Sequence, residues 1–264
     1  MVLDNLEIIL QNALSKYDIG YYHQGYEDYS ELIRRVAQTL HQSCLVLTSQ
    51  ETPRVIRRLL GENLPVRALQ LKGLQITEVE EIFKTKGAFW GSTSDLHQLV
   101  ESYAGNPLAL NIAFHKIDKL FDGNISDFLT QKTLVFGEIN QLLKEHFKRV
   151  SNTENMIIEW FAGNYQPVSL SELRSQMSPT ISTPQLLDAL ESLQERSLVD
   201  NNANLFSIAP MTREYINHQL IQNKIRYNIE HRQHPSQKHP SITTREKTKL
   251  SFNIPALPVV KQQS

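Results

Sequence analysis

The chain has 264 residues, 40% of them hydrophobic and 21% charged, which is the composition of a globular protein with one large or two small domains. A single cysteine, Cys44, excludes an internal disulfide framework and a multi-cysteine zinc site, and the apolar run after it predicts a buried, unreactive thiol. The sequence has no apolar run near the roughly 18 residues of a membrane span and no signal-peptide pattern. We therefore expect no membrane partner and a cytoplasmic location.

The net charge of −1 conceals two parts of opposite sign. From Lys224 onward the sequence holds eight basic and two acidic residues, a net charge of +6, which leaves −7 on the preceding body. An acidic body argues against a nucleic-acid-binding domain, so no DNA partner is expected. Residues 226–264 are rich in Pro, Ser, Thr, Gln and Lys, which predicts a disordered basic tail. Of the two interpretations of this tail, a solvated segment is favoured over a nucleic-acid-binding arm.

Strand and helix patterns alternate over residues 1–72. Short apolar runs predict three strands, at residues 2–3, 44–49 and 66–71. Periodic apolar residues predict the helices between them, at residues 6–14, 26–40 and 53–61. This alternation indicates part of a parallel α/β sheet, in which polar residues at the strand ends mark where ligands bind.

Residues 73–150 have the pattern of a helical bundle without strands. The first helix is predicted at 77–87, with Thr77 as its N-cap and Glu80 at the capping-box position. Pro107 lies in the first turn of another helix, as proline favours. The later helices are predicted at residues 93–105, 107–121, 125–131 and 135–150.

Residues 151–225 predict a third unit that combines helices with one hairpin. The three helices are predicted at residues 153–162, 169–177 and 182–199, the second capped by Ser169 or Ser171. An Asn-rich turn within residues 198–209 predicts a hairpin, and a closing helix follows at 211–225. Three helices followed by a hairpin are the layout of a winged helix. The expected fold is thus mixed α/β and α, and mostly helical.

Five segments follow one another in an informative order: "MVLDN", "LVLTSQETP", "LQLKGL", "YAGNPLALNIA" and "LFSIAPMTREYI". Together they resemble the NB-ARC group of STAND signalling ATPases, especially its multidomain bacterial versions. In the order given, the first three segments correspond to the Walker B strand, the sensor segment and the passage into the first helical subdomain of that family. The last two correspond to its Gly-x-Pro-Leu motif and to the position of its winged-helix histidine motif. The resemblance covers residues 1–220.

The resemblance implies a role for individual residues. It implies that Asp4 holds magnesium through water and that Pro107 packs against adenine. Asn5 follows Asp4 where the family often has an acidic residue. Gln50 stands in place of a sensor Arg that meets the γ-phosphate, and Ala209 in place of a histidine that contacts the β-phosphate of ADP. The residues also allow simpler interpretations, in which Asp4 caps the following helix and Pro107 only starts one.

The resemblance implies a truncated nucleotide-switch module, whose family role is ADP- or ATP-binding signal transduction. The phosphate-loop pattern G-x-x-x-x-G-K-[ST] does not occur in the chain, so no autonomous ATPase activity is expected. For this chain alone no cofactor is expected, whereas ADP or ATP and Mg²⁺ belong to the intact family. The missing half is attributed to a deletion, a split gene or a misplaced start codon. The expected role is that of a scaffold, with a protein partner or an upstream split-gene segment.

The alternative function is that of a winged-helix DNA-binding regulator. The helix that would enter the major groove carries Asp188, Glu191 and Glu195 with one nearby cation, Arg196. Phosphates repel such a helix, so the winged helix is interpreted as a packing and switching module. A third option, an enzyme of another kind, has no recognisable catalytic set in the sequence.

Overall fold

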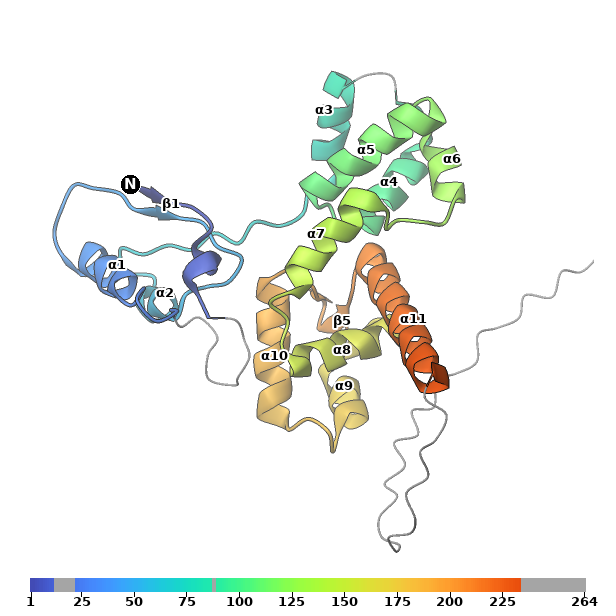
Figure 1. Cartoon of the computed structure of the whole chain (residues 1–264). Coiled ribbons are helices and arrows are strands. Elements are labelled where there is room, and N and C mark those ends of the chain that lie inside the picture. The colour runs from blue at the N-terminus through green and yellow to red at the C-terminus, as the bar shows by residue number, and fades with distance from the viewer. Residues whose placement is uncertain (12–21, 87–88, 234–264) are drawn as a thin grey trace, which may run out of the picture. The chain divides into compact units, whose positions relative to one another are not determined.

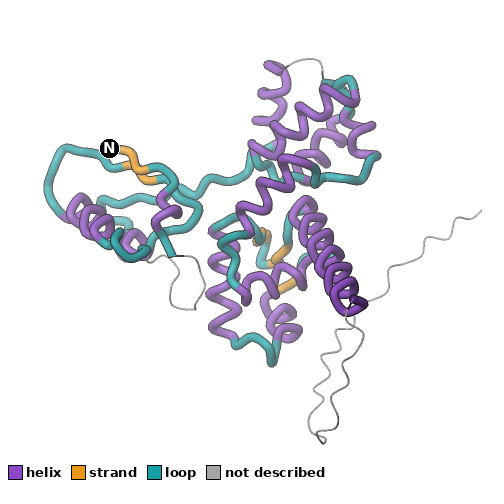
Figure 2. The backbone as a smooth tube through the Cα atoms, viewed as in Figure 1, coloured by secondary structure: helices purple, strands orange, loops and turns teal. Residues whose placement is uncertain are grey.

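The computed structural model describes residues 1–11, 22–86 and 89–233, and the chain divides into two compact units, residues 1–218 and 219–264. The described residues are mostly helical, as predicted, and their strands lie in one two-stranded and one three-stranded sheet (Figure 1, Figure 2). Within these residues, no helix is both long enough and apolar enough to cross a membrane. The disorder predicted for residues 226–264 is wrong for residues 226–233, which continue the closing helix, and the rest of the predicted tail lies outside the described residues.

The described residues of the N-terminal region, 1–11 and 22–72, form a short parallel sheet and two α-helices. Strand β1 (Val2–Leu3) pairs with β2 (Val46–Leu47), with Val2 opposite Val46. A 3₁₀ helix η1 (Leu6–Ile9) follows β1. Helices α1 (Asp28–Gln38) and α2 (Arg54–Leu59) lie within the ranges predicted from the apolar periodicity. The parallel α/β pairing expected for two of the three strands is therefore present.

Several local predictions in this region are wrong. The strand predicted at 66–71 does not form: Val66 makes one parallel bridge to Leu60, and Leu69 and Leu71 are 86% and 79% exposed. An apolar run needs a neighbouring strand to bury its side chains, and among the described residues that single bridge is all the pairing this run makes. The helix predicted from residue 6 is only the 3₁₀ turn, because Leu10 bridges to Tyr22 instead; residues 12–14 lie outside the described part. Cys44 is exposed rather than buried.

The described residues between 73 and 150 form five helices, each of which overlaps the range predicted for it. They are α3 (Ile76–Lys86), α4 (Thr93–Ser102), α5 (Pro107–Phe121), α6 (Ile125–Thr130) and α7 (Gly137–Phe147). The capping prediction for α3 is wrong, because the helix starts one residue earlier. The backbone N–H of Gln75 donates to the carboxylate of Glu78 at 2.7 Å, which places Thr77 inside the first turn.

Residues 151–233 hold three helices, a hairpin and a long closing helix. In chain order they are α8 (Asn152–Gly163), β3 (Val168–Ser169), α9 (Leu170–Met177), α10 (Thr183–Glu195), β4 (Asp200–Asn202), β5 (Leu205–Ser207) and α11 (Pro210–Gln233). The predicted hairpin is confirmed: β4 and β5 are antiparallel, and Ala203 and Asn204 between them both have positive φ. Sequence analysis missed β3, which pairs with the other edge of β5. Of the two proposed caps for α9, Ser169 is the one used.

Buried apolar side chains form two separate clusters. The larger runs from Val79 to Ile216 and is shared by the bundle and the segment that follows it. Contacts such as the Phe147–Tyr215 ring pair, with centroids 5.2 Å apart, lie at their junction. The smaller cluster belongs to residues 1–72 and consists of Leu6, Leu10, Tyr22, Ile33 and Ile56. The N-terminal sheet thus has a small core of its own.

Candidate functional site

The carboxyl ends of β1 and β2 bring together polar side chains that are distant in sequence. Parallel strands end at the same side of a sheet, so Asp4 after β1 and Thr48 after β2 become neighbours. The Thr48 hydroxyl donates to the Asp4 carboxylate, and the backbone N–H of Asn5 donates to the Thr48 oxygen at 3.0 Å. Asn5 has a φ of 54°, which turns the chain into η1. We call Asp4, Asn5 and Thr48 the sheet tip.

Asp4 does not cap the following helix, so that interpretation is wrong. The residue at the N-cap of η1 is Asn5, which makes no side-chain cap hydrogen bond. Asp4 is exposed, and its carboxylate and the Thr48 hydroxyl offer two side-chain oxygens. Magnesium takes six oxygen ligands, and at nucleotide sites several of them are waters and phosphates. Among the described residues no group of three or more His, Cys, Asp or Glu could hold a metal ion. The sheet tip therefore fits at most a partial magnesium site.

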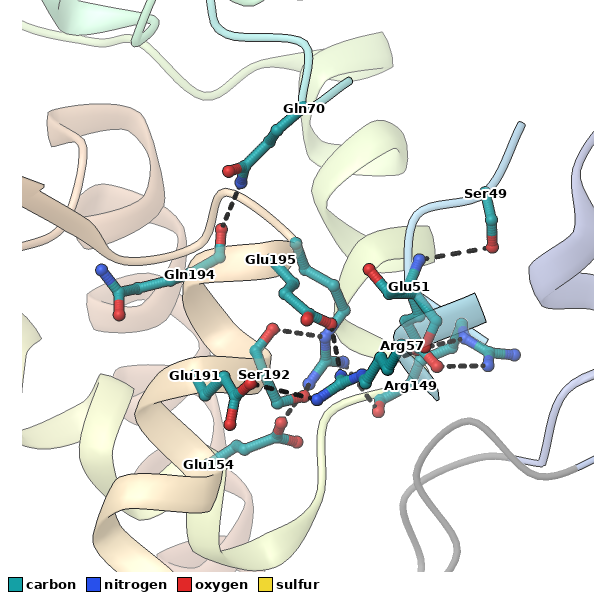
Figure 3. Close-up of polar contacts among 12 residues, drawn as sticks. Ser49, Glu51, Arg57, Gln70, Arg149, Glu154, Glu191, Ser192, Gln194 and Glu195 are labelled. Atoms are coloured by element: carbon teal, nitrogen blue, oxygen red, sulfur yellow. Dashed lines mark hydrogen bonds and ion pairs between the residues drawn. The ribbon is translucent and has the colours of Figure 1, made fainter. Parts of the chain in front are cut away.

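The segment after β2 is fixed by two buried carboxylates. The backbone N–H of Gln50 donates to Glu7 at 3.2 Å, while the Gln50 side chain is exposed. Glu7 is 7% exposed and Glu51 5% exposed. The Arg149 guanidinium binds both oxygens of Glu51, at 2.9 and 3.1 Å (Figure 3). It also donates to the backbone oxygen of Leu10 at 3.4 Å. Bidentate pairing of this kind fixes direction as well as distance.

Arg57 makes a second charged contact to a distant helix. Its guanidinium donates to Glu191 at 3.1 Å and to Glu195 at 2.7 Å, which lie one turn apart on α10 (Figure 3). Burial raises the pKa of Glu195, although the positive charge of Arg57 opposes that shift. We call Glu51, Arg57, Arg149, Glu191 and Glu195 the charged joint.

A buried ion pair between Arg196 and Glu154 lies next to the charged joint and contacts the backbone of Arg149. Arg196 and Glu154 are paired with side chains 4% and 1% exposed. Arg196 also donates to the backbone oxygen of Arg149 at 2.9 Å and to the Ser192 hydroxyl at 3.0 Å. Burial alone raises the pKa of Glu154, but the charge and hydrogen bonds of Arg196 outweigh it and hold that pKa below its usual value. The position of Arg149 is thus held by its own backbone, which Arg196 anchors.

The remaining predicted residues have structural roles. Pro107 is the first residue of α5 and is exposed; Asn106 caps the helix through the N–H of Ala109. Gly105 has a φ of +63°, and a Cβ there would lie 2.4 Å from the backbone oxygen of Leu74. The start of α5 at Pro107 and the close backbone approach at Gly105 together account for the "GNP" sequence. Among the described residues, no hydrogen bond or ion pair joins Pro107 to Asp4 or Gln50. Ala209 is buried directly before α11.

Sequence analysis predicted Asp4 of the sheet tip but not Thr48, and it missed the charged joint. The end of the first strand pointed to Asp4 and the family resemblance to Gln50, and the structure places both after the paired strands β1 and β2. The acidic residues of α10 were weighed only against DNA. Their signal was the spacing of Glu191 and Glu195, which places two carboxylates on one helix face and calls for a cation between them. Nothing in the sequence identified Arg57 as that cation.

Comparison with known proteins finds similarity to a segment of a much longer protein. No protein-family profile matches the sequence. It is 41% identical over 225 residues to an uncharacterized WD repeat-containing protein of Nostoc sp.; the match covers 84% of this chain. This chain spans only 18% of the length of that protein.

Two solved structures are similar at low identity. One is a signal transduction ATPase with numerous domains (STAND) with a tetratricopeptide repeat sensor from Pyrococcus horikoshii, at 15% identity and a TM-score of 0.29, covering 82% of this chain and 27% of that one. The other is a Walker-type ATPase of Pyrococcus abyssi, at 16% identity and a TM-score of 0.44, covering 75% and 59%.

Proposed function

We propose that this chain is the switch module of a STAND-type signalling protein of the NB-ARC group, and that alone it acts as a scaffold without hydrolysing ATP. The observation that carries the proposal is the sheet tip, where Asp4 and Thr48 meet at the carboxyl ends of two parallel strands. This is where α/β sheets bind ligands. In this proposal residues 151–225 are the winged helix that moves with the switch.

Hydrolysis is not expected because the residues that would neutralise phosphate are absent from the sequence. Phosphoryl transfer depends on a glycine-rich loop, its lysine and a further cation. No G-x-x-x-x-G-K-[ST] pattern occurs in the 264 residues, and Gln50 is uncharged. Any phosphate loop would have to come from residues outside these 264. With such a segment present, Asp4 and Thr48 would supply oxygen ligands to a magnesium–nucleotide complex.

The scaffold role rests on the open edge of the N-terminal sheet. Within the described residues β2 pairs only with β1, and Val46 is 49% exposed. Leu69 and Leu71 in the unpaired segment are exposed as well. Open apolar strand edges accept a further strand from another chain. An extended segment of a partner protein is therefore the proposed binding partner at this edge.

The alternative role in DNA binding gains no support from α10. Asp188 on this helix is exposed, and Glu191 and Glu195 are paired with Arg57. A major-groove helix needs cations toward the phosphates, and this face is acidic.

ATP turnover by the purified chain tests the proposal. We expect no magnesium-dependent hydrolysis, and equal background rates for the parent protein and Asp4→Ala. The matched control is Asp28→Ala, which removes an exposed carboxylate from the first turn of α1. Magnesium-dependent turnover that Asp4→Ala abolishes and Asp28→Ala preserves would overturn the expectation. A thermal shift with Mg–ADP that depends on Asp4 would show that the sheet tip alone still binds nucleotide.

A further inference from the structure

The small core of residues 1–72 meets the rest of the first unit through polar contacts. The N-terminal apolar cluster and the large cluster from Val79 to Ile216 share no member. Among the described residues, the side-chain contacts from residues 1–72 to later helices include those of Arg57, Gln70 and Arg149 (Figure 3), and Glu195 also accepts a hydrogen bond from the backbone of Thr52. Apolar packing resists salt, whereas ion pairs near the surface are screened by it. The more exposed pairs of Arg57 should therefore weaken as ionic strength rises, whereas the buried Glu51–Arg149 pair is screened much less.

The charged side chains of the joint attract one another when residues 1–72 lie against α10. Glu191 and Glu195 repel each other on one helix face, and Arg57 lies between them. Arg149 holds Glu51 through both carboxylate oxygens, with side chains 15% and 5% exposed. If residues 1–72 moved away, Glu191 and Glu195 would lose their cation and Glu51 its partner. The contacts are thus specific in direction, and the exposed ones are individually weak.

We propose that the charged joint is an electrostatic latch, which holds the end of β2 and helix α2 against α10 and releases them when its ion pairs are broken. Glu51 directly follows Gln50, whose backbone is bonded to Glu7 near the sheet tip. A displacement of residues 49–51 therefore pulls on Arg149, whose backbone Arg196 anchors. The latch connects the sheet tip to α10 through one short segment. It goes beyond the proposed function, because it requires no nucleotide.

A distance measurement across the joint tests the latch on the full chain. Cys44 is the one cysteine of the sequence and is exposed, so a spin label there reports on the end of the N-terminal sheet. A second label on Leu187→Cys, at a half-exposed position of α10, reports on the other side. We expect a narrow distance distribution at about 0.1 M NaCl and a broad one, with longer distances, at about 1 M, where the Debye length falls to about 3 Å.

Charge reversal provides the second arm of the test. In the doubly labelled protein, Arg57→Glu should broaden the distribution at low salt, because Glu191 and Glu195 then face a like charge. Arg35→Glu is the matched control, since Arg35 is exposed on α1 and pairs only locally with Glu31. It should leave the distribution narrow. Adding Glu191→Arg and Glu195→Arg to Arg57→Glu should restore the narrow distribution.

Two results would overturn the latch. A parent distribution that is unchanged between low and high salt would show that the contacts do not control attachment. So would an Arg57→Glu distribution as narrow as that of Arg35→Glu. Circular dichroism of each variant separates release from unfolding. If Arg57→Glu loses helix content, the salt titration of the parent, which needs no charge substitution, decides the question.

Discussion

Replacement of Arg196 by methionine should destabilise the protein by about 4 kcal/mol, because breaking one side of a buried ion pair leaves an uncompensated charge and costs about 3–5 kcal/mol. Methionine keeps the length and apolar character of the side chain and removes the guanidinium. The pair is buried on both sides, with side chains 4% and 1% exposed, so solvent screening does not reduce this figure. The substitution also removes the hydrogen bond to the backbone oxygen of Arg149, which adds about 1 kcal/mol at most.

Urea denaturation followed by circular dichroism measures this loss, and a double substitution sharpens it. Replacing both partners, as in Glu154→Gln with Arg196→Met, removes the buried charge altogether. Such replacements are often neutral relative to the intact pair, so the double variant should be clearly more stable than Arg196→Met alone. A loss below about 1 kcal/mol for Arg196→Met, the size expected of an exposed pair, would refute the argument. So would a double variant that is less stable than the single one.

Two further predictions follow from the same contacts and from the open sheet edge. The lowered pKa of Glu154 makes a contribution to stability that is present above the ordinary glutamate pKa of about 4.3 and is lost as pH falls through the folded-state value. The unfolding free energy of the parent should therefore decline below that pH more steeply than that of Glu154→Gln with Arg196→Met, as measured by urea denaturation at successive pH values. Backbone amides at 45–48 should exchange with solvent faster than those at 186–193, because β2 has one short partner strand whereas α10 packs on the large core. Equal protection in hydrogen exchange would contradict the open edge.

Local signals were enough to predict most helices and the hairpin. Pro107 begins α5 and Asn106 caps it, so two adjacent residues determine where that helix starts. The hairpin turn at Ala203 and Asn204 likewise depends on two neighbouring positive-φ positions. In both cases the information lies within a few residues. Such elements can be predicted without knowledge of the tertiary fold.

The failures occurred where structure depends on distant partners. Residues 66–71 have the composition of a strand, but a strand forms only when another pairs with it, and the pairing partner is not encoded in the run itself. Leu10 leaves the predicted helix because it bridges to Tyr22, which lies beyond residues 12–21. The α3 cap failed for a smaller reason: Gln75, which the pattern did not favour, is used in place of Thr77.

The same distinction explains why Asp4 of the sheet tip was predictable and the charged joint was not. Asp4 follows a short apolar run directly, a position that the sequence pattern itself marks, whereas its partner Thr48 is 44 residues away. Arg149 and Glu51 are 98 residues apart, and Arg57 is 138 residues from Glu195. Many arginines and glutamates in the chain satisfy the same local rules. Only the tertiary fold selects which of them meet.

The role of the acidic residues on α10 depends on which distant residues contact them. Its charge alone could exclude a role in DNA binding, because repulsion requires no knowledge of geometry. It could not assign a role, because attraction requires a cation in a defined place. The structure supplies that cation as Arg57, from a segment with a small core of its own. A segment with a small core of its own that is attached by ion pairs can change its position while the large core stays folded, which is the physical requirement for a two-state element. The charges that argue against a DNA-binding helix are therefore the ones that fit a switching joint.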